Sequence, residues 1–180
     1  MTIEANNTVI RAVIVDDHGI VRQGLRALLS QPGIEVVGEA ESGNEAVRLA
    51  QAIQPDVMLL DIRMKDGDGL QSLPQIKAAS PKTSVIILTT YASTAYLAKA
   101  ISGGAAGYLS KETDPEQIVR AVRSAAAGDA LIDRALLLAA LTHSADAHPP
   151  DLDGSFDTLI EPLSERERDV LHLMVQGFPN

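Results

Sequence analysis

The chain has 180 residues, of which 46% are hydrophobic and 22% charged, and its formal net charge at pH 7 is -9. This length provides one well-buried domain and a small addition, and the composition is that of a globular protein. The absence of Cys excludes disulfides and thiolate metal sites. No signal peptide and no apolar run of about 18 residues is present, so we expect a cytoplasmic protein with no membrane association.

The negative charge is concentrated near the C-terminus. Residues 144–180 contain eight acids and two arginines, a net charge of -6. Affinity for nucleic acid depends on Lys and Arg facing phosphates. The sequence therefore predicts no ready surface for binding DNA.

Short apolar segments alternate with helical patterns over residues 8–128. Helix signals between them include Ser42 with Glu45, a Ser-x-x-Glu capping box, and Pro115 in a first turn. Regular alternation predicts an α/β fold, a doubly wound parallel sheet with helices on both faces. The expected strands are residues 11–15, 34–40, 56–61, 84–89 and 106–110.

The pattern changes after Gly128. Residues 129–160 have the composition of a linker and include one short apolar segment, 134–141, that predicts a helix. A second capping box, Ser164 to Glu167, opens a further helix within residues 161–180.

Polar side chains follow four of the expected strands. Asp16 and Asp17 follow the first, Asp61 ends the third, Thr89 ends the fourth and Lys111 follows the fifth. The carboxyl ends of parallel strands meet at one edge of a sheet. The sequence therefore predicts three carboxylates, a hydroxyl and an ammonium on one rim, a set that suits a divalent cation and a phosphoryl group.

Each group has a chemical role on that rim. A carboxylate such as Asp61 can form an aspartyl phosphate. Magnesium takes oxygen ligands, which Asp16, Asp17 and Asp61 supply. Lys111 would act as a point charge on phosphoryl oxygens, and the Thr89 hydroxyl could donate to another.

Each residue also has a simpler interpretation when taken alone. Asp16 or Asp17 could cap the first helix, Thr89 could be an ordinary strand-end hydroxyl, and Lys111 a solvated charge. Tyr108 could be a half-buried strand aromatic. Because polar residues of the right kinds occur at the ends of four separate strands, the pattern as a whole favours a functional site over these separate interpretations.

Other binding chemistries find no support. The histidines show no metal-ligand spacing and are interpreted as structural or solvated. No Gly-x-Gly-x-x-Gly or Walker loop follows the first strand, which argues against nucleotide binding. The histidines are His18, His143, His148 and His172.

Motifs at the strand ends resemble a known family. The chain resembles the receiver domain of bacterial two-component response regulators of the NarL/FixJ subgroup, over residues 8–128. The resemblance implies a flavodoxin-like (βα)5 fold. The motifs are Val15-Asp16-Asp17-His18, Leu60-Asp61-Ile62-Arg63-Met64, Asp68-Gly69-Leu70, Leu88-Thr89-Thr90-Tyr91 and Gly107-Tyr108-Leu109-Ser110-Lys111-Glu112.

The resemblance assigns a phosphoacceptor and a metal site. It implies that Asp61 accepts a phosphoryl group from a sensor histidine kinase. Mg²⁺ would be held by Asp16, Asp17, Asp61 and the backbone carbonyl of Arg63.

The resemblance also implies a conformational switch. Thr89, Tyr108 and Lys111 would bind or sense the phosphoryl group, the Thr89 hydroxyl moving toward it and the Tyr108 ring turning inward. A homodimer through receiver helices is a further expected partner.

One position departs from the family pattern. Lys65 stands where the family commonly has Pro, in the loop after the phosphoacceptor. Lys65 should leave that loop more flexible and adds a positive charge near Asp61. No catalytic group is removed by this change.

The C-terminal segment resembles the opening of a LuxR-type helix-turn-helix output domain, whose function is transcription regulation. Only the first helix and the following turn match, and Pro179 replaces the usual Ser or Thr. We therefore expect promoter DNA as a partner of the full-length protein but no DNA binding by this chain, since a second helix must enter the major groove.

Two other functions remain as alternatives. A phosphohydrolase with an Asp nucleophile and Mg²⁺ usually needs an acid two residues after the nucleophile, where this chain has Arg63. A degenerate receiver would act by surface contacts alone, which the intact acids and Lys111 argue against. The expected protein is no enzyme beyond self-phosphorylation and slow autodephosphorylation.

Overall fold

The computed structural model describes residues 9–65, 67–90, 93–129 and 131–132. Several sequence-based expectations lie outside these residues. They concern the N-terminal eight residues, Tyr91, the short linker helix and the C-terminal helix.

The core of the molecule is a six-stranded sheet in which every neighbouring pair of strands is parallel. The predicted parallel α/β architecture is therefore confirmed. In sheet order the strands are β2 (Ile34–Ala40), β1 (Ile10–Val15), β3 (Val57–Asp61), β6 (Ser84–Thr89), β7 (Gly107–Ser110) and β8 (Leu131–Ile132).

The sixth strand, β8, was not predicted. It pairs Leu131 with Gly107 and Ile132 with Tyr108, after the point where the sequence indicated a linker. Two residues cannot display the period-2 alternation on which strand prediction depends. The sheet therefore extends one short strand past the five expected ones.

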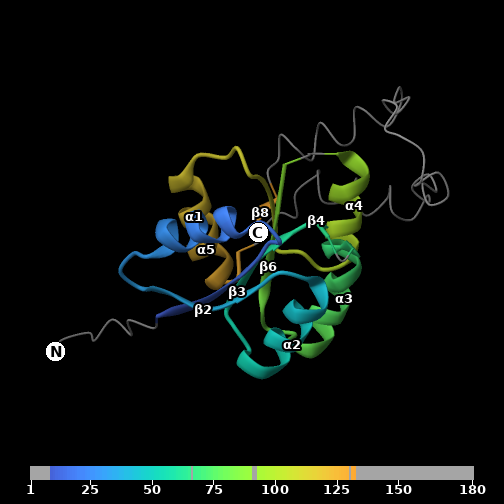
Figure 1. Cartoon of the computed structure of the whole chain (residues 1–180), viewed down its shortest axis with the longest axis horizontal. Helices are drawn as coiled ribbons and strands as arrows, with labels where there is room; N and C mark the ends of the chain where they lie inside the picture. Colours follow the sequence, from blue (N-terminus) through green and yellow to red (C-terminus); the bar gives the residue numbers. More distant parts are fainter. Residues whose placement is uncertain (1–8, 66, 91–92, 130, 133–180) are drawn as a thin grey trace, which may run out of the picture.

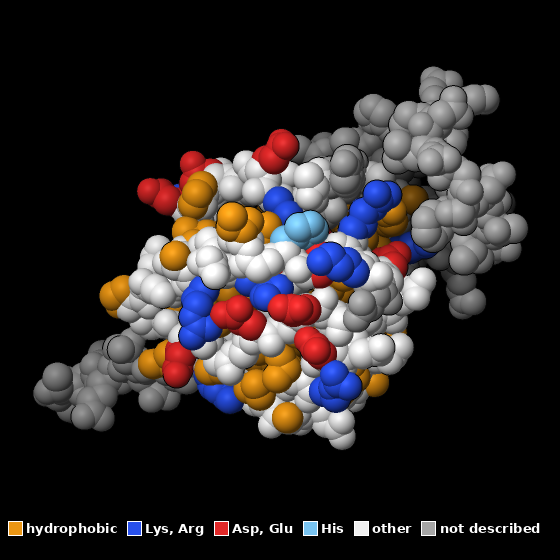
Figure 2. All heavy atoms as spheres, viewed as in Figure 1, with side chains coloured by type: hydrophobic (Ala, Val, Ile, Leu, Met, Phe, Trp, Pro, Cys, Tyr) orange, Lys and Arg blue, Asp and Glu red, His pale blue; other side chains and the backbone are white. Residues whose placement is uncertain are grey.

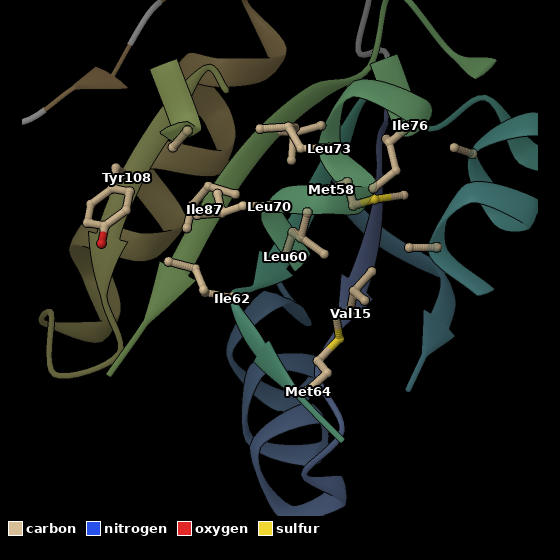
Figure 3. Packing of buried hydrophobic residues seen from close by; sticks show 14 of the residues in the cluster. Val15, Met58, Leu60, Ile62, Met64, Leu70, Leu73, Ile76, Ile87 and Tyr108 are labelled. Carbon is tan, nitrogen blue, oxygen red and sulfur yellow. The ribbon is translucent and has the colours of Figure 1, made fainter. Parts of the chain in front are cut away.

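Helices cover both faces of the sheet (Figure 1). One hydrophobic cluster lies between the sheet and α2, α3 and α4, and a second lies between the sheet and α1 and α5. The first cluster, shown in Figure 3, includes Leu60 of β3, Leu73 of α3 and Tyr108 of β7. The helices are α1 (Gly19–Leu29), α2 (Gly43–Ile53), α3 (Gly69–Ala79), α4 (Thr94–Ser102) and α5 (Pro115–Ala126).

Burial on both faces explains the unbroken apolar character of the central strand. All five residues of β3 are buried, including the terminal Asp61. Strands covered on both faces appear in sequence as continuous hydrophobic runs. This is why β3 could be predicted from Val57 to Leu60 alone.

Short polar side chains begin several helices. The Ser42 hydroxyl accepts the Glu45 N–H at 3.3 Å at the start of α2, as predicted. The second half of the capping box differs, because Glu45 Oε2 accepts the N–H of Glu41 at 2.9 Å. At α5, Asp114 caps the helix ahead of Pro115.

A small hairpin follows β3 and was not predicted. It pairs β4 (Arg63–Met64) with β5 (Gly67–Asp68), antiparallel. Gly69 then approaches the main chain closely, because a Cβ there would lie 2.0 Å from the carbonyl oxygen of Asp61. Glycine at this position therefore lets α3 begin directly beside the end of β3.

Within the described residues, none of the helices is long and apolar enough to cross a membrane.

Candidate functional site

Three aspartates gather at the carboxyl ends of β1 and β3. These strands are neighbours, with Val15 paired to Leu60, so Asp16 and Asp17 directly follow one strand and Asp61 ends the other. Strand order reverses here, since β2 lies on one side of β1 and β3 on the other. Open α/β sheets bind ligands at such a reversal.

Lys111 joins this group from the position directly after β7. Its Nζ lies 2.8 Å from Asp61 Oδ2 and 2.6 Å from Asp16 Oδ2. The Lys111 N–H donates to the carbonyl oxygen of Thr89 at 2.8 Å, which extends the pairing of β6 and β7 to the rim. We call Asp16, Asp17, Asp61 and Lys111 the acidic rim.

Two carboxylates of the acidic rim are buried, while Asp17 and Lys111 are half-buried. Asp16 is 1% exposed and Asp61 is 4% exposed. Burial raises the pKa of Asp61 above its usual 3.8, while the hydrogen bond and charge of Lys111 oppose the increase. The Arg63 N–H also donates to the Asp61 carboxylate and lowers its pKa.

Lys111 shows the opposite balance. Burial alone would lower the pKa of its ammonium group, but hydrogen bonds to Asp16 and Asp61 and the charges of both acids raise it overall. Lys111 therefore remains a cation against two carboxylates.

Two buried oxygens of the rim, Asp16 Oδ2 and Asp17 Oδ1, have a nitrogen as their close polar neighbour. Lys111 Nζ lies 2.6 Å from Asp16 Oδ2, and His18 Nδ1 lies 2.7 Å from Asp17 Oδ1, so each oxygen keeps a second lone pair for another partner. Buried carboxylate oxygens with spare acceptor capacity are the ligands that Mg²⁺ prefers. The residues present therefore fit a hard divalent cation.

The remaining oxygens of the acid pair hold the loops in place. Asp16 Oδ1 accepts the His18 N–H at 2.9 Å, and Asp17 Oδ2 accepts the Lys65 N–H at 2.9 Å. The N-cap of α1 is His18, with no side-chain capping bond. The alternative interpretation, in which Asp16 or Asp17 caps α1, is therefore wrong.

The Lys65 contact gives physical meaning to the departure from the family pattern. Proline has no N–H, so the hydrogen bond from residue 65 to Asp17 depends on the presence of another residue type there. Lys65 thus ties the loop after β3 to the acid pair after β1.

Thr89 and Tyr108, the predicted switch residues, are both buried. Thr89 is 2% exposed and ends β6, beside Lys111. Tyr108 is 1% exposed, so the interpretation as a half-buried aromatic is wrong. Its ring lies in the cluster covered by α4 (Figure 3), and burial raises its pKa to about 12 against a backbone hydrogen bond at Ser93.

His18 belongs to this site although its spacing gave no such indication. Its Nδ1 lies 2.7 Å from Asp17 Oδ1 and 3.3 Å from Asp16 Oδ1. One ligand atom from each of Asp16, Asp17, His18 and Asp61 lies within 4.8 Å of the others. The available signal was its position immediately after the acid pair, at the start of a helix.

Basic and acidic side chains surround this end of the molecule (Figure 2). Arg22 of α1 donates through Nη1 to the carbonyl oxygen of Asp16 at 2.6 Å, and it also pairs with Glu39 and Glu41. Arg22 therefore fastens the backbone of the acid pair to α1 and to the end of β2.

Comparison with known proteins identifies the class. Residues 12–123 match the family described as "Response regulator receiver domain". The chain belongs to this family, and the predicted fold and resemblance are confirmed. The receiver domain of a Mycobacterium tuberculosis response regulator, the putative NarL, has 37% sequence identity and a TM-score of 0.64, covering 67% of this chain and 98% of that one.

Within this class the chain is a response regulator similar to the NarL and LuxR transcriptional regulators. The nitrate/nitrite regulator NarL of Escherichia coli K12 is 34% identical over 93% of this chain and 76% of that protein. DevR/DosR of M. tuberculosis is 37% identical over 95% of this chain and 76% of its own length. A LuxR-family regulator from Aurantimonas has a TM-score of 0.71 at 30% identity, covering 77% of this chain and all of that one.

These relatives are response regulators, which are not enzymes in the usual sense. The chain spans about three quarters of the length of these curated relatives.

Proposed function

We propose that this response regulator accepts a phosphoryl group on Asp61 from a sensor histidine kinase, with Mg²⁺, and thereby controls a DNA-binding output domain. One observation carries the proposal. The Asp61 carboxylate ends a central strand, pairs with Lys111 at 2.8 Å and lies within 4.8 Å of ligand atoms from Asp16 and Asp17.

The chemical step is a transfer to a carboxylate oxygen. An Asp61 oxygen forms a bond to phosphorus as the bond from phosphorus to the donor breaks, and the donor atom keeps that electron pair. The donor is a kinase phosphohistidine or a small acyl phosphate. Lys111 stays against Asp61 Oδ2 and provides a cation for the oxygens of the arriving group.

Mg²⁺ would be held by Asp16, Asp17, Asp61 and the backbone carbonyl of Arg63. When bound, it neutralises charge on the phosphoryl oxygens. The two buried acceptors on Asp16 and Asp17 support this assignment, because they leave capacity for a cation. Each acid keeps its second oxygen for a backbone N–H, which orients it.

The phosphoryl group acts on a switch formed by Thr89, Tyr108 and Lys111. A Thr89 hydroxyl that hydrogen-bonds the group only in the modified state supplies the differential interaction that a switch requires. Lys111 contacts both Asp61 and the Thr89 backbone, which supports a mechanical link between them.

The switch has its own test. Thr89→Ala should still accept phosphate but lose the change in hydrogen exchange across residues 93–110 on phosphorylation. An unchanged exchange response in that variant would refute this route.

Incubation with acetyl phosphate and Mg²⁺ tests the main proposal. A stoichiometric, slowly hydrolysed acyl phosphate is expected, and Asp61→Asn should abolish it. Asp56→Asn is the matched control, because Asp56 lies at the opposite end of β3 and binds the Arg11 N–H at 2.8 Å.

Other outcomes identify the other functions. Multiple turnover of acetyl phosphate would indicate a phosphohydrolase, and no label would indicate a degenerate receiver. Full labelling of Asp61→Asn would refute the phosphoacceptor assignment.

The proposal includes the domain plan, with a receiver over residues 8–128, a linker over 129–160 and an output segment over 161–180. A cytoplasmic location and a homodimer through receiver helices belong to it as well. The NarL/LuxR-type relatives support a DNA-binding output.

A further inference from the structure

We propose that Arg22 is a positioning residue of the phosphoryl-transfer site, because its guanidinium fixes the peptide that joins Asp16 to Asp17. Through this peptide it sets where both carboxylates lie. The inference rests on the proposed function, in which these two acids serve the transfer to Asp61. Arg22 acts through the acid pair and not on the phosphoryl group itself.

The position of Arg22 in α1 directs its side chain toward the acid pair. Arg22 is the fourth residue of the helix, and its N–H donates to the carbonyl oxygen of His18 at 3.1 Å. Helical side chains lean toward the N-terminus, so the guanidinium extends back over the turn that leads from Asp16 into α1. There Nη1 donates to the Asp16 carbonyl oxygen at 2.6 Å. The Arg22 side chain is 13% exposed, so this contact is largely shielded from solvent.

Both backbone groups of Asp16 are held in this way. Its N–H donates to the carbonyl oxygen of Ala40 at 3.1 Å, and its carbonyl accepts from Arg22. Val15 is the last residue of β1, so Asp16 lies just past the regular strand. A side chain therefore provides the donor where the strand ends. Because a peptide unit is planar, fixing this carbonyl also fixes the N–H of Asp17 and the directions from which both side chains leave the backbone.

Two glutamates hold the guanidinium itself. Arg22 Nε lies 3.5 Å from Glu39 Oε2, and Nη2 pairs with Glu41 Oε1. Each of the three nitrogens thus has a different partner. This arrangement requires the planar fork of arginine, whereas lysine offers a single nitrogen. A fork anchored at two nitrogens presents the third to Asp16 in one orientation.

The ion pairs explain little by their contribution to stability. The side chain of Glu39 is 30% exposed and that of Glu41 is 67% exposed. Pairs at solvent-exposed positions typically add little to the free energy of unfolding. The arm that reaches Asp16 is the shielded part of the network. Orientation of the acid pair therefore explains the network better than stabilisation of α1 does.

A β-bulge in β2 brings the glutamates to Arg22. The pairing of β1 with β2 shifts by one residue partway along the strands, which leaves Val37 as an extra residue in β2. Val37 packs in the cluster beneath α2, α3 and α4. Residues two apart in a regular strand share a face, so Glu39 would point away from α1 without the shift. The bulge turns Glu39 toward α1, and bulges commonly re-aim side chains beside active sites.

The test measures how labelling by acetyl phosphate depends on Mg²⁺ in the full chain. Arg22→Met removes the fork, and Arg22→Lys keeps the charge with one nitrogen. In both variants the Mg²⁺ concentration for half-maximal labelling rate should rise about tenfold, because loss of groups that orient metal ligands typically costs about 10–100-fold. The rate at saturating Mg²⁺ should fall much less. A purely structural role would instead lower the labelled fraction at every Mg²⁺ concentration alike.

Arg26→Met is the matched control on the same helix. Arg26 lies one turn further along α1 and pairs with the same Glu39 at 2.5 Å, and its side chain is 55% exposed. Within the described residues its guanidinium makes no bond to Asp16. This variant should keep the wild-type dependence on Mg²⁺.

Nuclear magnetic resonance checks the contact without any phosphodonor. The carbonyl carbon resonance of Asp16 should move in Arg22→Met and Arg22→Lys, because a hydrogen bond to that carbonyl is lost, and it should stay in place in Arg26→Met. A Mg²⁺ titration followed by the same spectra should show the loss of affinity directly.

Three results would overturn this inference: wild-type Mg²⁺ dependence in Arg22→Lys, equal weakening in Arg26→Met, or an Asp16 carbonyl resonance that does not respond to loss of Arg22. Arg22→Lys decides the question if Arg22→Met does not fold. Failure of the wild type to be labelled would instead count against the proposed function.

Discussion

The two ends of strands β3 and β6 carry opposite kinds of polar group. At their carboxyl ends stands the acidic rim, where buried charges face one another. At their amino ends lies a neutral network, which we define as Gln54, Ser80 and Thr83. Ser80 and Thr83 are buried and Gln54 is exposed, and the three residues hydrogen-bond to one another and to nearby main-chain carbonyls.

The neutral network joins α2, α3 and the strands beside them. The Thr83 hydroxyl donates to the carbonyl oxygen of Pro55 at 2.6 Å and lies 2.7 Å from Ser80 Oγ. Ser80 donates to Gln54 Oε1 at 2.9 Å, and Gln54 Nε2 donates to the carbonyl oxygen of Ala79 at 2.9 Å. Gln54 is the C-cap of α2 and takes a left-handed backbone conformation there, with φ of 49°.

The comparison separates stability from function. The buried hydroxyls of Ser80 and Thr83 have their hydrogen-bond partners, and such satisfied neutral groups stabilise the fold. The acidic rim instead keeps three carboxylates close together with one lysine, which costs stability unless a cation or phosphoryl group arrives. We expect perturbations at the two ends to differ in sign and in their response to Mg²⁺.

Mg²⁺ should give the largest effect, and only at the acidic rim. At a concentration one hundred times Kd, binding to the folded state alone adds about 2.7 kcal/mol to the free energy of unfolding. Asp17→Asn should reduce this gain, whereas Thr83→Val should retain it in full. Thermal melts at low salt, with and without millimolar Mg²⁺, measure the gain in melting temperature of each variant. Equal gains in Asp17→Asn and Thr83→Val would contradict the assignment of Mg²⁺ binding to the acidic rim.

Thr83→Val should produce the next largest effect. Thr83 is fully buried, and the change leaves the Pro55 carbonyl without its 2.6 Å donor. Loss of such a bond costs about 1–3 kcal/mol, measurable by urea unfolding. Thr83→Ser keeps the hydroxyl and should lose less. Equal losses in both variants would assign the effect to packing of the methyl group.

Asp61→Asn should raise the melting temperature at neutral pH by a few degrees. The pKa of Asp61 is raised in the folded protein above its usual 3.8, so the unfolded chain ionises more readily and ionisation favours unfolding. This cost is fully present above the folded pKa and disappears as pH falls below the unfolded value.

The gain from Asp61→Asn should therefore shrink as pH falls toward 4. Asp56→Asn removes a carboxylate that accepts the Arg11 N–H at the other end of β3. It should bring no gain. A stabilisation by Asp61→Asn that did not vary with pH would contradict the assignment to buried charge.

Lys65→Pro should give the smallest effect, a loss of Mg²⁺ affinity of up to about tenfold. The substitution removes the N–H that holds Asp17 Oδ2. Lys65→Ala keeps the N–H and removes only the side-chain charge, so it should not weaken Mg²⁺. If calorimetry found the two variants equal, the backbone contact would have no part in binding.

The sequence predicted most of the fold, because long apolar strands carry a strong signal. Residues 84–89 form β6 with the predicted bounds, and Ser42 begins α2 as expected. The hairpin of β4 and β5 and the strand β8 were missed because each has two residues per strand. The strand β8 depends in addition on pairing with β7, whose residues lie far back along the chain.

The acidic rim could be located for a different reason. Parallel topology brings the ends of successive strands together, so Asp16, Asp61 and Lys111 could be placed on one edge without coordinates. His18 could not, because its ring position depends on the dihedral angles of a loop and on the Lys65 contact that holds Asp17. The burial of Tyr108 likewise depends on how α4 covers the sheet.

The burial of Tyr108 also gives this protein an optical signature. The chain has no Trp and three Tyr, which are Tyr91, Tyr96 and Tyr108, so its near-ultraviolet emission comes from one short stretch of sequence. The Tyr108 hydroxyl ionises only near pH 12, well above an ordinary tyrosine near 10. An alkaline absorbance titration therefore distinguishes a buried tyrosine ring from an exposed one. It reports whether Tyr108 is still buried.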